Sequence, residues 1–87
     1  MYKIIRITDN NDVDKTDEDA LGRIGRVIDE NQSLISPGCS GFFYCVVPGF
    51  HKSLRTTMIR RVKRDEDSMI VKTENSIYYF TKIADDE

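Results

Sequence analysis

The sequence predicts a mainly β domain, a small antiparallel barrel of five strands with one short helical turn. Five segments of five to eight residues combine apolar, aromatic and β-branched side chains, as strands do. Polar turn signals separate these segments, a long irregular stretch follows the first, and a hairpin-type reversal joins the last two. Short strands linked by meander turns are typical of a small closed barrel.

The length of 87 residues suits one domain and leaves no room for a second. An apolar fraction of 39 % and eight aromatic residues supply enough material for a core. We therefore expect a single barrel domain over residues 1–84 and a frayed acidic tail over residues 85–87.

The first strand is expected over Met1–Thr8, with Met1, Ile5 and Ile7 on one face and much of both faces covered. Asp9-Asn10-Asn11-Asp12 ends it, because Asn and Asp side chains bond to their own backbone and favour turns. Thr16-Asp17-Glu18-Asp19 then has the spacing of a helix cap, and Gly22 can close one helical turn.

The second strand is expected over Arg23–Glu30, where Gly25 indicates a bulge or a close backbone approach. A polar turn, Asp29 to Gln32, follows it. The apolar run Phe42–Val47, bounded by Pro48-Gly49, is the strand best suited to the core, because its aromatic and β-branched residues favour a strand over a helix.

The last part of the chain reads as a connector, Leu54–Thr57, followed by three segments that alternate along the sequence. In Met58–Arg64 neither face is apolar: if Met58 and Val62 point inward, Arg60 lies between them, and if Ile59 points inward, Arg61 and Lys63 need an explanation. The strands Ser68–Thr73 and Ser76–Ile83 are joined by the two-residue reversal Glu74-Asn75. The segment Ile77–Phe80 can close the barrel or pair across a two-fold axis, which leaves the oligomeric state open.

A short motif supports this architecture. Gly22-Arg23-Ile24-Gly25-Arg26-Val27-Ile28 resembles the glycine-x-x-glycine-x-valine turn and strand of SH3-like barrels of the KOW and Tudor type. The later order of long loop, aromatic strand, short connector and C-terminal hairpin is similar to that fold as well. The resemblance implies an SH3-like barrel and a binding role, because most barrels of this kind bind RNA, DNA, ribosomal surfaces or peptides.

The net charge of −2 hides three blocks of different sign. Residues 1–30 carry five basic against eight acidic residues, residues 65–87 carry two against seven, and residues 31–64 carry six basic residues and no acidic one. We expect one distinctly basic region, unless the acidic loops fold over it and pair with it.

No catalytic or metal site is expected. Cys39, Cys45 and His51 have a C-x5-C-x5-H spacing, but a structural zinc site needs four ligands, and nothing else supplies them. A nucleophile and base could be built only from these three residues, and no phosphate-binding loop is present. We therefore expect no enzyme activity, no cofactor and reduced thiols. The chain has neither a signal peptide nor an apolar stretch of about 20 residues, so a cytoplasmic protein without membrane contact is expected.

The function expected is that of a non-enzymatic binding module that recognises a protein partner through its charged barrel surface. The alternative is binding of RNA or DNA, since basic side chains beside aromatic ones suit phosphates and bases, although a pI of 5.4 is low for that role. A further alternative is a phage-encoded inhibitor of a host or defence protein. The expected binding residues are Lys52, Arg55, Arg60, Arg61, Lys63, Arg64, Tyr44 and Phe50.

Overall fold

The chain forms six antiparallel strands, one short α-helix and one 3-10 turn in the computed structural model, which describes residues 1–46 and 53–83. In chain order these are β1 (Tyr2–Thr8), α1 (Glu18–Arg23), β2 (Val27–Ile28), the 3-10 turn (Glu30–Gln32), β3 (Ser40–Phe43), β4 (Leu54–Arg64), β5 (Ser68–Thr73) and β6 (Ile77–Lys82). The mainly β architecture with one short helix is confirmed, but the expected number of five strands is wrong. The tail expected over residues 85–87 lies outside the described residues.

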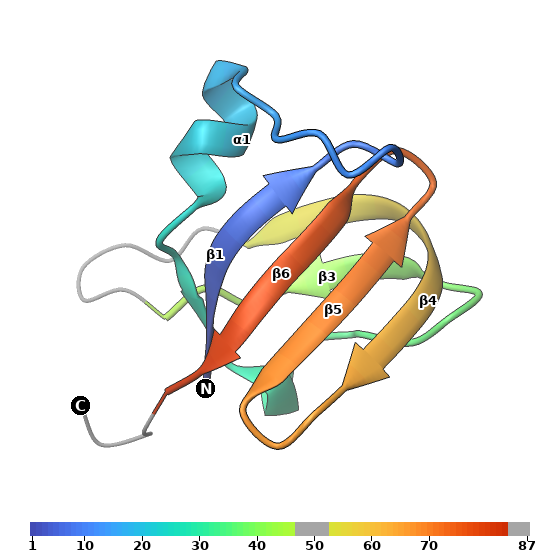
Figure 1. Ribbon diagram of the computed structural model, residues 1–87. Helices are drawn as coiled ribbons and strands as arrows, with labels where there is room; N and C mark the ends of the chain where they lie inside the picture. Colours follow the sequence, from blue (N-terminus) through green and yellow to red (C-terminus); the bar gives the residue numbers. More distant parts are fainter. Residues whose placement is uncertain (47–52, 84–87) are drawn as a thin grey trace.

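The strands form a nearly closed barrel in the order β2-β1-β6-β5-β4-β3. The first and last strands pair with each other, and β1, β6, β5 and the end of β4 lie side by side in front of β3 (Figure 1). A bridge between Ile28 and Cys45 draws β2 toward the residues that follow β3. The Val46 amide donates to the Val27 carbonyl at 2.9 Å beside it. These contacts leave little open sheet edge between the two outermost strands.

A bulge in β1 decides which isoleucines enter the core. The register with β6 shifts between Ile4 and Arg6, so Ile5 is the extra residue. Ile4 and Ile7 are therefore both buried although they lie three residues apart, whereas Ile5 is 52 % exposed. The expectation that Ile5 and Ile7 share one face is wrong, because alternation is interrupted between them.

The long strand β4 crosses from one side of the barrel to the other. Its start pairs with β3, Leu54 lying opposite Phe43, and its end pairs with β5, Val62 lying opposite Val71. Residues 54–57, expected as a connector, thus belong to the strand. A register shift between Ile59 and Arg61 lets Ile59 and Val62 both pack toward the core. Strict alternation could not turn Ile59 and Val62 inward together, and the bulge makes this possible while Arg61 and Lys63 point outward.

Only a small part of the segment expected as the second strand is strand. The helix α1 extends through Gly22 and Arg23, and only Val27–Ile28 remain as strand β2. Asp17 caps the helix, its carboxylate accepting from the Ala20 amide at 3.2 Å, within the segment predicted to cap. Gly25 has φ +95°, a conformation that favours glycine and turns the chain back toward β1.

The remaining expectations agree more closely with the structure. The strand Ser68–Thr73 has the predicted bounds, and Glu74-Asn75 forms the predicted two-residue reversal before β6. The core strand β3 begins earlier than predicted and ends at Phe43, although Cys45 beyond it is also buried. Phe43 is fully buried, and its ring lies edge-on to Tyr78 and Phe80, with centroids 5.3 Å from each.

The β1 bulge predicts very different costs for the same substitution at two neighbouring positions. Ile7→Ala removes a side chain that is 2 % exposed and should lower the free energy of unfolding by about 2–5 kcal/mol. Ile5→Ala should change it by less than about 0.5 kcal/mol, because Ile5 points outward. Urea denaturation followed by circular dichroism measures both values. Equal losses at the two positions would show that β1 is not bulged at Ile5.

Candidate functional site

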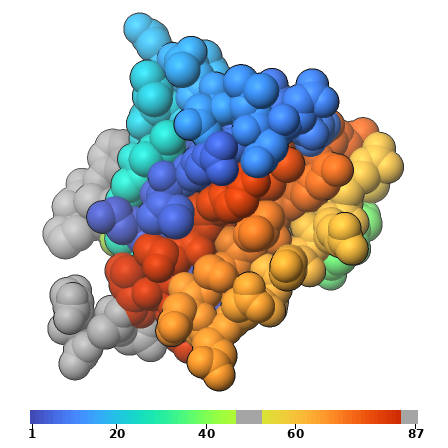
Figure 2. All heavy atoms as spheres, viewed as in Figure 1, coloured from blue at the N-terminus to red at the C-terminus, as the bar shows by residue number. Residues whose placement is uncertain are grey.

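The outer side of β4, β5 and β6 carries a basic and apolar surface, which we call the cationic face. Its members are Arg61 and Lys63 on β4, Ile70 and Lys72 on β5, and Ile77 and Tyr79 on β6. They line a shallow hollow of about 320 Å³. Figure 2 shows the molecule from this side, with β6 (red) and β5 (orange) between β4 (yellow) and the N-terminal segment (blue).

The strand register arranges these side chains in two rows across the sheet. One row runs from Lys63 through Ile70 to Tyr79, and Tyr79 is followed by Arg6 on β1. The second row runs from Arg61 through Lys72 to Ile77. Adjacent strands lie about 4.8 Å apart, so neighbours within a row are close enough to contact one ligand together.

Local sequence patterns explain why these residues point outward. Strands β5 and β6 alternate, and burial of Met69, Val71, Tyr78 and Phe80 turns the intervening side chains to the outside. On β4 the bulge at Arg60 brings Arg61 and Lys63 to the same side as Lys72. The face is therefore a consequence of how the core is filled.

The basic run of β4 divides into paired and unpaired cations. Arg60 contacts the Glu74 carboxylate at 3.3 Å, and Arg64 is paired with Glu30. Within residues 1–46 and 53–83, no carboxylate forms an ion pair with Arg61, Lys63 or Lys72. Two arginines of the basic strand, Arg60 and Arg64, are thus paired with acidic residues of the chain. The three cations on the face are available to a ligand.

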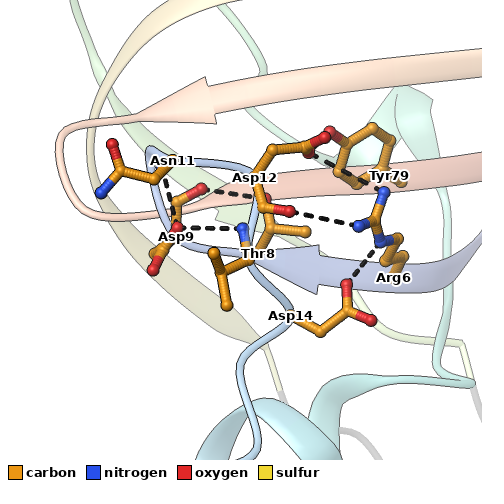
Figure 3. Close-up of polar contacts among 8 residues, drawn as sticks. Arg6, Thr8, Asp9, Asn11, Asp12, Asp14 and Tyr79 are labelled. Carbon is orange, nitrogen blue, oxygen red and sulfur yellow. Dashed lines mark hydrogen bonds and ion pairs between the residues drawn. The ribbon is translucent and has the colours of Figure 1, made fainter.

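The acidic loop, residues 9–14, lies at the edge of the cationic face that is formed by Tyr79, beside Arg6 of β1 (Figure 3). The Arg6 guanidinium donates to Asp14 at 2.5 Å, and its carbon lies 5.1 Å from the centre of the Tyr79 ring. The Tyr79 hydroxyl donates to Asp12 at 2.5 Å. The loop thus occupies the Arg6 and Tyr79 end of the row that begins at Lys63.

The acidic loop is held in place by its own backbone contacts. One Asp9 carboxylate oxygen accepts from the amides of Asn11 and Val13, at 2.8 and 3.1 Å (Figure 3). Asp12 has φ +65°, which short polar side chains tolerate. The side-chain amide of Asn10 donates to the Glu74 carbonyl at 2.6 Å and ties the loop to the β5–β6 reversal. The turn predicted at residues 9–12 is therefore confirmed.

These contacts shift two ionisation equilibria. The hydrogen bond that Tyr79 donates to Asp12, together with partial burial and the Asp12 charge, raises the pKa of the Tyr79 hydroxyl. The hydrogen bond to Asp14 and the nearby acidic charges raise the pKa of Arg6. Both residues are thus held in the protonated forms that bind carboxylates.

The other residues expected to bind lie elsewhere or outside the described chain. Arg55, near the start of β4, rests on the Phe42 ring at 5.6 Å from its centre. Tyr44 is half-buried beside the Ile28–Cys45 bridge, where its backbone amide donates to the Ser33 hydroxyl at 2.9 Å, and it does not line the cationic face. Phe50 and Lys52 lie outside the described residues. Of the expected residues that the structure describes, Arg61 and Lys63 are the two that line the cationic face.

Sequence reasoning missed Lys72, Ile70, Ile77 and Tyr79. The signal was available in the alternation of the last two strands and in the two-residue reversal between them. A two-residue hairpin loop at Glu74-Asn75 places Lys72 opposite Ile77 and Ile70 opposite Tyr79, as observed. Only the bulge at Arg60, which aligns Arg61 and Lys63 with these residues, has no local signal.

Of the residues considered for catalysis or metal binding, the structure describes the two cysteines. Cys39 is exposed, Cys45 is buried, and both are free thiols. His51 lies outside the described residues. Among the residues that are described, no three His, Cys, Asp or Glu side chains are placed to hold a metal ion. The described helices also include none long and apolar enough to span a membrane.

Comparison with known proteins gives no relative for this chain, since no family model, curated protein or solved structure matches it.

The Asp12 contact predicts an elevated ionisation midpoint for Tyr79. Ultraviolet titration of the phenols, with Tyr79→Phe identifying the signal, should show Tyr79 ionising above its ordinary pKa. Asp12→Asn should lower the midpoint, because it removes the negative charge that favours the neutral phenol. Since the folded pKa is raised, this contribution to stability is present below the ordinary tyrosine pKa and is lost as pH rises through the raised value. An unchanged midpoint in Asp12→Asn would contradict the contact.

Proposed function

We propose that this protein is a non-enzymatic binding module that recognises a partner protein through the cationic face. The observation that carries the proposal is a group of three cations, Arg61, Lys63 and Lys72, that form no ion pair within the described residues and surround an apolar and aromatic hollow. Exposed cations that border apolar side chains suit a partner that offers carboxylates and apolar groups together.

The partner that fits best is an extended acidic segment with apolar side chains. Its carboxylates would contact the cations of β4 and β5, and its apolar side chains would cover Ile70 and Ile77. The protein provides its own example at the other end of the face, where Asp12 and Asp14 bind Tyr79 and Arg6. A carboxylate is thus a ligand that this kind of sheet surface already accepts.

Nucleic acid is the less favoured ligand for three reasons. Arg6 covers the Tyr79 ring, so a base cannot readily stack on that side. The acidic loop lies beside the face and repels a phosphate backbone. The pI of 5.4 also weakens non-specific attraction to nucleic acid at physiological salt.

We also propose that the barrel is of the SH3-like kind. The long connection between β1 and β2, the bent β4 and the C-terminal hairpin support this relationship. The barrel has six strands, whereas the resemblance implied five. The glycine motif departs as well, because Gly22 lies in α1 and only Val27–Ile28 form a strand.

Zero-length crosslinking tests the proposed surface directly. A carbodiimide joins an amine to a carboxylate that it contacts, so Lys63 and Lys72 should become linked to Asp or Glu residues of a protein captured from the native host. Lys72→Glu should reduce capture about tenfold, because it replaces an attraction with a repulsion within the interface. Mass spectrometry of the crosslinked peptides identifies the joined residues.

Lys82→Glu is the matched control, since Lys82 is an exposed lysine on the neighbouring strand β6 but does not line the hollow. It should leave capture unchanged. Equal loss in both variants, or crosslinks confined to other lysines, would contradict the proposed face.

A direct binding assay separates the protein partner from nucleic acid. Fluorescence anisotropy with single- and double-stranded RNA and DNA at low salt should show no binding that depends on the face. Arg60→Ala/Arg61→Ala serves as the comparison variant. If wild type binds an oligonucleotide and this variant loses it, the nucleic-acid function replaces the one proposed.

A further inference from the structure

A second cavity lies at one mouth of the barrel, away from the cationic face. It is bounded by α1, the start of β4 and the β5–β6 reversal, and has a volume of about 270 Å³. Ile7, Ala20 and Tyr78, all buried, contribute to its lining. Mouths of β-barrels are places where small ligands bind, because interior side chains and loop residues converge there.

Three basic residues line this cavity, and none of them forms an ion pair with an acidic residue in the ranges 1–46 and 53–83. They are Lys15, Arg23 and Arg55. Asp17 and Asp19 line the same cavity, yet within the described ranges neither forms an ion pair with these cations. One Asp17 oxygen instead accepts from the Ala20 amide as the helix cap. The cavity therefore holds more positive than negative charge, and its cations are not neutralised by direct contact.

Arg23 and Tyr78 form the inner part of the site. Arg23 is half-buried, and its guanidinium donates to the Tyr78 hydroxyl at 2.6 Å, a neutral group rather than a carboxylate. Tyr78 is only 3 % exposed, and in the described part of the chain its hydroxyl donates to no acceptor. A buried hydroxyl usually has an acceptor for its proton, and a half-buried guanidinium usually has an anion. One bound anion would satisfy both groups.

We infer that the barrel mouth binds a small molecule bearing a carboxylate or phosphate group. Arg23 and the Tyr78 hydroxyl would hold the anionic group, and Lys15 and Arg55, which also line the cavity, would add positive charge around it. Asp17 and Asp19 at the rim disfavour a highly charged polyanion. The site is independent of the proposed function, because Tyr78 and the face residue Tyr79 lie on opposite sides of β6.

Nuclear magnetic resonance titration of the full chain tests this inference. Sodium phosphate and sodium acetate, each compared with sodium chloride at equal ionic strength, should cause saturable shifts in the amides of Ala20, Thr57 and Ser76, which line the cavity. The two titrations also distinguish a phosphate from a carboxylate preference. Arg23→Gln should weaken binding at least about tenfold, as expected for a charged hydrogen-bond donor removed from a partly buried site.

Three further variants complete the design. Arg55→Gln alters an exposed residue and should weaken binding without risk to the fold, and Tyr78→Phe should do so by removing the hydroxyl. Arg60→Gln, a matched arginine outside the cavity, should leave the affinity unchanged. Lys72→Glu should also leave it unchanged, so failure of the proposed function would not affect this result. Shifts that do not saturate, that equal those in chloride, or that persist in both Arg23→Gln and Arg55→Gln would overturn the site.

Discussion

The packing of Phe43 against two aromatic rings of β6 is the contact on which the rest of the structure depends. Phe43 ends strand β3, which lies behind β5 and β6 in Figure 1, and its ring meets Tyr78 and Phe80 edge-on. Large buried rings dominate the energetics of a small core, and a chain of this length has little other apolar area to replace them. The same contact orients β6, because burying Tyr78 and Phe80 turns Ile77 and Tyr79 outward.

One strand thereby serves two surfaces with different chemistry. On the inner side, the Tyr78 hydroxyl reaches Arg23 at the barrel mouth. On the outer side, Tyr79 lies between Arg6 and Ile70 and donates to Asp12. Neighbouring tyrosines therefore belong to separate environments, one enclosed and one open. Because both are attached to the same central strand, the core positions both surfaces rigidly relative to each other.

The ion pairs formed in the folded chain determine which cations of the basic strand can bind a ligand. Exposed ion pairs contribute only about 0–1 kcal/mol each to stability, so those of Arg60 and Arg64 do not account for the fold. The two ion pairs instead distinguish the arginines that are already bound from the cations that are not. They occupy two arginines of the basic strand and leave Arg61 and Lys63 beside Lys72 without partners in the described chain. A net charge of −2 is thus compatible with a surface suited to acidic ligands.

Features that depend on neighbouring residues could be predicted from the amino-acid sequence alone. The β5–β6 hairpin follows from alternation and the reversal at Glu74-Asn75, and the helix start follows from the capping residues near Asp17. The bulges, the extra strand and the pairing of charges became visible in the folded chain, because each depends on contacts between distant residues. A bulge depends on register with a strand elsewhere in the chain, and Arg64 meets Glu30 across 34 positions of sequence. Local patterns carry no information about such distant partners, so they predicted the basic strand but not which of its cations remain free to bind.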